Sequence, residues 1–313
     1  MPVQAAEVLF PMEFETPMFH MGPFDNAALS KNYALVRQAG SIAEPDWSAL
    51  VGPASCHIVT AAGREAIGLA LRALRLERDD EVLIVNTTGS PYVTSCVTGQ
   101  IDPVCRHSRH RSSRTRAVFL IHEFGFPASL PAGLDLDGLP IIEDCAYAFG
   151  SQNETQTVGT IGDFVVYSFS KAFPLQYGGL LTSRRPLPGL ESRLTPASRA
   201  HLLAQLTHYL RSADQAFARR RANYLAYEER FAAHGFAPRF TAGPRTLPHA
   251  FVVAVDDEAA AQILKERMNR AGIESSVYYG GGGYFLPNHQ GLDSAAIEYI
   301  VENFTAIWRD IRS

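Results

Sequence analysis

Ile141-Ile142-Glu143-Asp144 is a short apolar run that ends in two carboxylates, and Tyr167-Ser168-Phe169-Ser170-Lys171 follows it, with Lys171 27 positions after Asp144. Short, near-continuous apolar runs are typical of central strands that are covered on both faces. Asp144 therefore ends a predicted buried strand, and ligands of open α/β sheets bind beyond the carboxyl ends of the strands. Alone, an aspartate in this place is commonly a structural cap, but a suitably placed lysine makes it a candidate for a ligand site.

Lysine is rare in this chain. Its three lysines, Lys31, Lys171 and Lys265, stand against 25 arginines. Arginine replaces lysine on most solvated surfaces, but not where the chemistry needs an amine that can lose its proton. Lys171 is therefore a candidate Schiff-base nucleophile, and Asp144 is a candidate partner for the protonated pyridine nitrogen of a cofactor ring.

The composition is that of a folded protein of 313 residues, enough for one large domain or two modest ones. The net charge of −4 gives no sign of a nucleic-acid partner, and no apolar stretch approaches the roughly 20 residues that span a bilayer. The N-terminal residues lack the basic and apolar regions of a signal peptide. The four cysteines show no CxxC spacing, so neither a metal site nor a disulfide framework is expected. These features favour a cytoplasmic protein.

Short apolar runs alternate with helical stretches, a pattern that favours an α/β sheet. Helices are expected over Ala62–Leu74 and, with an interruption, over Ala200–His234. The expected strands are Glu81–Val85, Ala117–His122, Pro140–Glu143, Phe164–Phe169 and Gly179–Ser183.

The pattern restarts after Gly243-Pro244 with a β-α-β-α block that is typical of a small α+β domain. Residues 1–216 are expected to form a large α/β domain, and residues 217–313 a linking helix and the small C-terminal domain. The glycine run at 280–283 reads as a flexible loop. The expected C-terminal elements are strands over His249–Val255 and Ile273–Tyr279 and helices over Glu258–Ala271 and Ala295–Ile311.

The start of the first helix has the character of a phosphate site. Small residues before a helix let backbone N–H groups approach a phosphate, and the helix dipole adds to the attraction. Thr60-Ala61-Ala62-Gly63-Arg64 fits this pattern, and Arg64 could add a charge-assisted hydrogen bond. An ordinary loop with Thr60 as N-cap is the simpler alternative. Ser168 is a further candidate phosphate ligand; with Lys171 it also spells the S-x-x-K of serine hydrolases, but the sequence has neither K-T-G nor S-D-N.

Two further features are interpreted as structural. His122 ends an expected strand and is interpreted as a buried, hydrogen-bonded histidine, with a cofactor-facing role as the alternative. The segment 106–116 carries five arginines and two histidines. It is interpreted as a solvated surface turn, with an anion-binding patch as the alternative.

Several short motifs follow one another along the chain in a fixed order. They are Gly63-Arg64-Glu65-Ala66-Ile67, Glu81-Val82-Leu83-Ile84-Val85, His122-Glu123-Phe124-Gly125, Ile142-Glu143-Asp144-Cys145-Ala146, Gly162-Asp163-Phe164, Ser168-Phe169-Ser170-Lys171, Gly178-Gly179 and Arg220-Arg221-Ala222-Asn223-Tyr224. In this order they resemble the DegT/StrS-type family of pyridoxal-phosphate-dependent aminotransferases, many of which act on sugars. The resemblance covers roughly Ala54 to the end of the chain.

The resemblance implies a fold-type I architecture, with a mainly parallel central sheet in the large domain and a small C-terminal α+β domain. It implies that Lys171 forms a Schiff base with pyridoxal 5′-phosphate and that Asp144 pairs with the pyridinium nitrogen. Gly63, Arg64 and Ser168 would bind the cofactor phosphate. The implied activity moves an amino group, from glutamate in much of the family, to a keto sugar that is commonly nucleotide-linked, in polysaccharide or natural-product biosynthesis. The family also implies a homodimer with shared active sites.

The chain resembles a shortened, divergent member of this family. The aromatic residue that usually stacks on the cofactor ring falls on Gly89, and Tyr92 is the candidate replacement. The glutamine that commonly follows the aspartate by three positions is Tyr147, which is expected to contact the cofactor. Two other hypotheses therefore stay open: a pyridoxal-phosphate enzyme with a non-sugar substrate, and a non-catalytic cofactor-binding relative.

Overall fold

The computed structural model describes residues 16–38, 44–131, 133, 136, 138–154 and 157–313. Its internal contacts divide the chain into two compact units. The large unit comprises residues 24–213 and 243–247, and the small unit comprises residues 16–23, 214–242 and 248–313. The expected boundary after residue 216 lies inside one helix, α8 (Ala213–Ala233).

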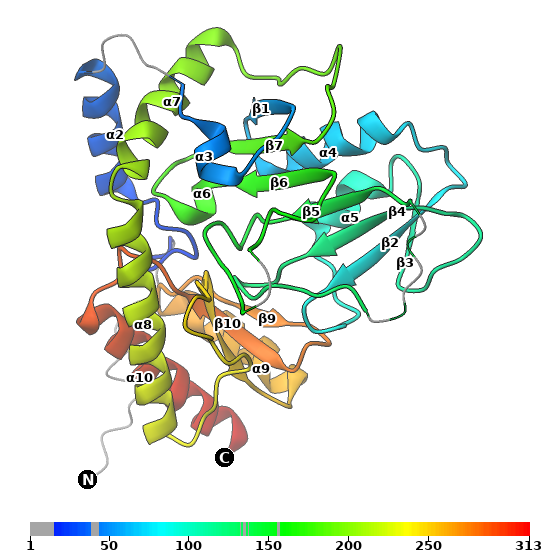
Figure 1. Cartoon of the computed structure of the whole chain (residues 1–313). Helices are drawn as coiled ribbons and strands as arrows, with labels where there is room; N and C mark the ends of the chain where they lie inside the picture. The colour runs from blue at the N-terminus through cyan, green and yellow to red at the C-terminus, as the bar shows by residue number, and fades with distance from the viewer. Residues whose placement is uncertain (1–15, 39–43, 132, 134–135, 137, 155–156) are drawn as a thin grey trace. The chain divides into compact units, whose positions relative to one another are not determined.

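A seven-stranded sheet in the order β1-β7-β6-β5-β4-β2-β3 forms the framework of the large unit (Figure 1). Neighbouring strands from β6 to β3 are parallel, whereas β7 pairs antiparallel with both β6 and β1. The mainly parallel sheet expected from the sequence is therefore confirmed. The strands are β1 (Cys56–Thr60), β2 (Glu81–Asn86), β3 (Arg106–Ser108), β4 (Thr115–Ile121), β5 (Ile141–Asp144), β6 (Phe164–Ser168) and β7 (Gly179–Ser183).

One helix covers the part of this sheet in which β7 pairs antiparallel with β1 and β6. The helix α4 (Gly63–Leu74) packs on β1, β6 and β7 through side chains such as Ile67 and Leu71, which are almost fully buried. Burying one such side chain contributes about 1.5–3 kcal/mol, so the helix start is held firmly over the sheet. The other helices of this unit are α2 (Asn26–Gln38), α3 (Trp47–Val51), α5 (Ser95–Ile101), α6 (Phe169–Ala172) and α7 (Pro196–Leu210).

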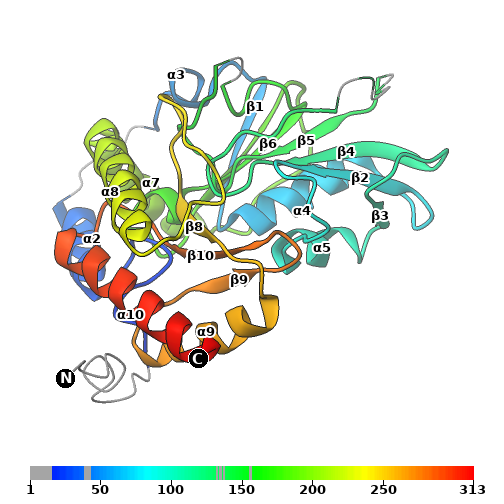
Figure 2. The same cartoon turned by 90° about the horizontal axis from the view of Figure 1, so that it is seen from below.

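The small unit contains a three-stranded antiparallel sheet in the order β8-β10-β9. Figure 2 shows α9 (Glu258–Arg270) and α10 (Ser294–Arg312) together on one face of this sheet. The expected α+β character is therefore confirmed. The expected glycine loop is shorter than predicted, because Gly283 already belongs to the central strand. The strands are β8 (Ala250–Ala254), β9 (Ser276–Tyr278) and β10 (Gly283–Pro287).

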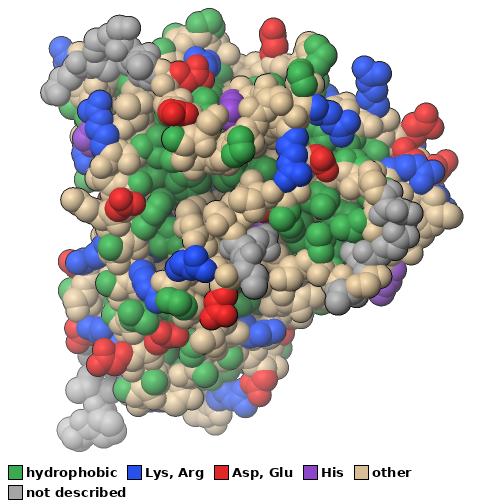
Figure 3. All heavy atoms as spheres, in the orientation of Figure 1, with side chains coloured by type: hydrophobic (Ala, Val, Ile, Leu, Met, Phe, Trp, Pro, Cys, Tyr) green, Lys and Arg blue, Asp and Glu red, His purple; other side chains and the backbone are tan. Residues whose placement is uncertain are grey.

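The surface carries both signs of charge. On the face drawn in Figure 3, basic and acidic side chains are interspersed and do not gather into a patch of one sign. Among the described residues, we find no helix with the length and apolar character needed to cross a bilayer.

Candidate active site

The two carboxylate side chains at the end of β5 lie on opposite faces of the sheet. Successive side chains of a strand point to opposite sides, so Glu143 and Asp144 are separated although they are adjacent in sequence. Asp144 is 6% exposed, and its Oδ1 accepts a hydrogen bond of 2.9 Å from the backbone N–H of Ala146. Burial raises the pKa of Asp144, while the positive charge of Lys171 acts in the opposite direction. The aspartate and the lysine singled out in the sequence therefore sense each other's charge.

Lys171 stands in the one-turn helix α6 that follows β6. Because β6 pairs with β5 in parallel, Lys171 and Asp144 both lie at the carboxyl ends of these neighbouring strands. Burial lowers the pKa of Lys171, and the carboxylate of Asp144 opposes this effect. A lysine in such surroundings loses its proton more readily than a solvated one, which is what a nucleophilic amine requires.

The predicted phosphate ligands Gly63 and Ser168 lie against each other. A Cβ atom on Gly63 would stand 3.2 Å from Cβ of Ser168 and 3.6 Å from the carbonyl oxygen of Tyr167. The N-cap of α4 is Ala62, whose methyl side chain cannot accept a hydrogen bond from the first turn. Backbone N–H groups and a serine hydroxyl thus converge at a helix N-terminus, the arrangement that binds phosphate groups in many proteins. Arg64 is exposed in the same turn, and its charge also lowers the pKa of Lys171.

The loop after β2 contains Gly89, the position where an aromatic residue was expected from the family pattern. Gly89 has a φ of 71°, the left-handed region that favours glycine, and it is exposed. Thr88 donates two hydrogen bonds of 3.0 Å, from its backbone N–H and its hydroxyl, to Oε2 of Glu123. Nδ2 of Asn86 donates to Oε1 of Glu123 over 3.1 Å and to the carbonyl oxygen of Tyr92 over 3.4 Å. The backbone of the loop is therefore held at both ends, and the role of the Tyr92 ring stays a prediction.

One arginine of the 106–116 segment points toward this loop. Arg109 is partly buried, and its guanidinium donates to Oδ1 of Asn86 over 2.5 Å. The interpretation of the whole segment as a solvated turn is therefore wrong at Arg109, because a polar partner at the end of β2 draws this side chain inward.

On the other face of the sheet, His122 and Glu143 form a buried pair. Nε2 of His122 lies 2.9 Å from Oε1 of Glu143, and Nδ1 of His122 accepts from the backbone N–H of Ala128 over 2.8 Å. The second contact fixes the tautomer, so Nε2 carries the proton and donates it to Glu143. The interpretation of His122 as a buried, hydrogen-bonded histidine is confirmed.

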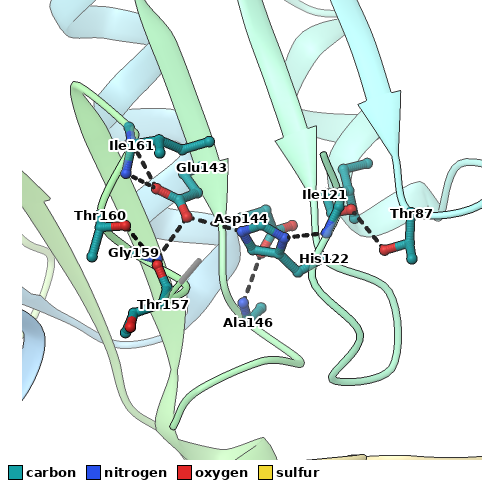
Figure 4. A network of polar contacts seen from close by, with 12 residues as sticks. Thr87, Ile121, His122, Glu143, Asp144, Ala146, Thr157, Gly159, Thr160 and Ile161 are labelled. Atoms are coloured by element: carbon teal, nitrogen blue, oxygen red, sulfur yellow. Dashed lines mark hydrogen bonds and ion pairs between the residues drawn. The ribbon is translucent and has the colours of Figure 1, made fainter. Parts of the chain in front are cut away.

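Glu143 also ties down the segment that leads into β6. Its two oxygens accept hydrogen bonds from the backbone N–H groups of Gly159, Ile161 and Gly162 over 2.6, 3.0 and 2.7 Å. Figure 4 shows the carboxylate between this segment and the His122 ring. Burial by itself would raise the pKa of Glu143, but the hydrogen bond from His122 and those from the backbone donors lower it.

His122, Glu143 and Cys145 bring three ligand-type atoms within 4.8 Å of one another. This cluster is buried, and hydrogen bonds within the protein already occupy both ring nitrogens and both carboxylate oxygens. Burial raises the pKa of the Cys145 thiol, and the nearby Glu143 adds to this effect, whereas a metal ligand must be a thiolate. We therefore interpret the cluster as part of the hydrogen-bonded core.

The sequence pattern brought out the lysine, the aspartate and the candidate phosphate ligands, but it missed the polar groups around them. Glu123, Asn86 and Arg109 support the loop after β2, and Glu143 supports the segment before β6. The sequence does carry a signal for such residues, because Asn86 and Glu143 are polar residues at or near the ends of buried strands. A buried polar group needs hydrogen-bond partners.

The comparisons with known proteins show the family and the fold. The model of the DegT/DnrJ/EryC1/StrS aminotransferase family matches residues 44–187 and 176–300. The UDP-N-acetyl-3-dehydro-alpha-D-glucosamine 3-aminotransferase of Acidithiobacillus ferrooxidans is 27% identical over 270 residues, which cover 74% of this chain and 70% of that protein. The aminotransferase TlmJ of Streptoalloteichus hindustanus has a TM-score of 0.75 at 18% identity, covering 95% of this chain and all of that one (100%). The PMP form of Spr1654 from Streptococcus pneumoniae has a TM-score of 0.71 at 16% identity, covering 96% and 99%.

These matches have different weight. At such identities the two solved structures show the fold alone, and they confirm the fold-type I architecture of an aminotransferase. The family match reaches from residue 44 to residue 300 and includes every element of the candidate site. The chain belongs to the DegT/DnrJ/EryC1/StrS aminotransferase family.

Proposed function

We propose that this aminotransferase uses pyridoxal 5′-phosphate to move an amino group from glutamate to a nucleotide-linked keto sugar. The observation that carries the proposal is the position of Lys171 and Asp144 at the carboxyl ends of two neighbouring parallel strands, where each acts electrostatically on the other. The relative from Acidithiobacillus ferrooxidans is named for a UDP-linked dehydro sugar, which supports this class of acceptor.

The residues present fit the cofactor. A side chain at Gly63 would crowd Ser168, and the glycine leaves the backbone N–H groups at the start of α4 beside the Ser168 hydroxyl, where both could bind a phosphate group. Asp144 is a buried carboxylate beside a cation, the type of group that can pair with a protonated ring nitrogen. Lys171 is an amine whose pKa burial lowers. These three features correspond to the phosphate, the ring nitrogen and the aldehyde of the cofactor.

When bound, pyridoxal phosphate supplies an electron sink for the bond that is broken at the amino donor. Asp144 would keep a proton on the ring nitrogen, because its negative charge favours the protonated form there. The Lys171 amine would act as general base for the proton on the donor's α-carbon and then as general acid when that proton is returned. Ser168 and the first turn of α4 would bind and orient the phosphate.

The role of Lys171 can be tested with the purified chain and added pyridoxal phosphate. We expect a visible absorbance band that bleaches with glutamate, and a borohydride-reduced adduct on the peptide that contains Lys171. Lys171→Arg retains the charge but cannot form this bond, and it should lose both signals; Lys265→Arg in α9 is the matched control and should keep them. An adduct on another lysine, or a band that responds to no amino donor, would contradict the proposal.

The acceptor requires a separate assay. After glutamate has converted the bound cofactor, a panel of nucleotide-linked keto sugars and non-sugar keto compounds is added, and return of the visible band reports amino transfer. Return with a keto sugar supports the proposed substrate class. Return only with non-sugar compounds would assign the chain to the alternative substrate class.

We also propose that the protein is a cytoplasmic homodimer, which the family resemblance supports. Sedimentation equilibrium of the full chain would determine the assembly. If the sites are shared between subunits, mixing two singly inactive variants should restore part of the activity, and independent subunits would restore none.

A further inference from the structure

The amine of Lys171 lies directly over an aromatic ring. Its Nζ is 3.6 Å from the centroid of the Tyr147 ring, well within the roughly 6 Å over which a cation is attracted to a ring face. Lys171 and Tyr147 are both partly buried. Limited contact with water strengthens such an attraction, since less of it is screened.

The Tyr147 ring is itself held in place. It stands three residues after Asp144, and the Phe124 ring packs beside it with a centroid distance of 6.2 Å and an interplanar angle of 52°. Phe124 has a φ of 55°, an uncommon conformation for a bulky residue. The backbone around β4 and β5 thus presents the Tyr147 ring next to the lysine, with the Phe124 ring packed beside Tyr147.

Three charged or titratable groups from different elements also act on Lys171. Asp144 on β5 and the thiol of Cys96 on α5 favour its charged form, whereas Arg64 on α4 disfavours it. Burial disfavours the charged form most. The ring face of Tyr147 is a further partner for the cation, and it directly contacts Nζ.

We propose that Tyr147 is a positioning residue for the reacting amine: its ring face holds Nζ of Lys171 beside Asp144 and favours the protonated amine until a substrate or cofactor group displaces it. This inference rests on the proposed role of Lys171. The active part of Tyr147 is the ring face, so its hydroxyl is not required.

Competitive labelling can test this directly, because the chain has only three lysines. The full chain without added cofactor is acetylated with acetic anhydride over a range of pH, and mass spectrometry of the peptides gives the titration midpoint of each lysine. Wild type and Tyr147→Phe, which keeps the ring, should give the same midpoint for Lys171. Tyr147→Leu is apolar but has no ring face, and it should lower that midpoint by about 0.5–1 pH unit.

Internal references separate a local effect from a general one. Lys31 is exposed and Lys265 lies in the small unit, so neither midpoint should move in any Tyr147 variant. Tyr147→Met, a second replacement without a ring, should reproduce the shift of Tyr147→Leu. An unchanged midpoint in both of these variants, or an equal shift in Tyr147→Phe, would overturn the proposal.

The labelling result does not depend on cofactor binding. If pyridoxal phosphate forms no adduct with Lys171 but the midpoint shifts as expected, the ring contact stands and the proposed function fails. If the adduct forms normally and the midpoint does not shift, the proposed function stands and the positioning role of Tyr147 fails.

Discussion

Nε2 of His122 donates a hydrogen bond of 2.9 Å to Oε1 of Glu143, and neither side chain has exposed surface. This pair joins the end of β4 to β5. Three backbone N–H groups of the 159–162 segment complete the contacts of the carboxylate. The stability of this part of the sheet therefore depends on a single ionised group.

Glu143→Gln should destabilise the protein by about 3–5 kcal/mol, because the amide would turn an N–H₂ group toward donors in a buried site. The pKa of Glu143 is lowered from the ordinary 4.5 in the folded protein. Its contribution to stability is thus fully present above about pH 4.5 and is lost as the pH falls through the lower folded pKa. Urea unfolding from about pH 3 to about pH 7 should show that the free energy of unfolding of the wild type falls at acid pH. The variant should show a weaker dependence on pH.

The matched control is a similar pair at the surface. His234 lies 3.5 Å from Glu302, whose side chain is 55% exposed. Glu302→Gln should change the free energy of unfolding by at most about 1 kcal/mol. Equal effects of the two substitutions would show that the buried pair has no special role.

A second prediction concerns Gly179, which lies between β1 and β6 beneath the start of α4. A Cβ atom there would stand 2.7 Å from the carbonyl carbon of Ala62 and 2.9 Å from the nitrogen of Gly63. Gly179→Ala should therefore displace the helix start, cost about 1–3 kcal/mol of stability and weaken binding of pyridoxal phosphate. Gly99→Ala in α5, where the described surroundings are open, should be neutral or stabilising by about 0.5–1 kcal/mol. Denaturant unfolding and cofactor titration measure both effects, and unchanged cofactor affinity in Gly179→Ala would count against the phosphate site.

Glu123 should control the order of the loop after β2. In Glu123→Gln, the new N–H₂ group would face donors from Thr88 or Asn86, and the mismatch should cost about 1–3 kcal/mol. Hydrogen exchange at residues 87–92 should become faster. Glu258→Gln, an exposed carboxylate that accepts a hydrogen bond from Gly280, should change stability by no more than about 0.5 kcal/mol. Unaltered exchange in the loop would show that Glu123 does not hold it.

Tyr92 can be tested as the source of the stacking face that Gly89 lacks. Tyr92→Ala should weaken binding of pyridoxal phosphate by about 0.5–1.5 kcal/mol beyond the loss of contact area, and Tyr92→Phe should bind normally. Fluorescence titration with the cofactor gives both affinities. If Tyr92→Ala binds as tightly as the wild type, Tyr92 has no stacking role.

The sequence predicted the central strands well because they are apolar on both faces. The end of β5 at Asp144 and the whole of β7 lie within a residue of expectation. The strands β1 and β3 were missed, since β3 is three polar residues at the sheet edge and β1 contains His57. Pairing with neighbouring strands, which local pattern does not encode, makes them strands.

The candidate site was likewise predicted only in part from the sequence. The family resemblance implied that Gly63 and Ser168 bind one phosphate group, and the structure places them in contact. The contact between Lys171 and Tyr147 could not be predicted, because it depends on side-chain directions that only the packed structure sets. The inward turn of Arg109 likewise depends on Asn86, which is distant in sequence.

The alternation of Glu143 and Asp144 along β5 has a consequence for how this chain can vary. Inserting or deleting one residue within 141–144 would exchange the two acids between the faces of the sheet. The longer acid would then meet the lysine, and the shorter one would have to reach the histidine and the backbone donors. Neither exchange preserves the observed contacts, so the order of the two acids along β5 links the buried histidine pair to the candidate site.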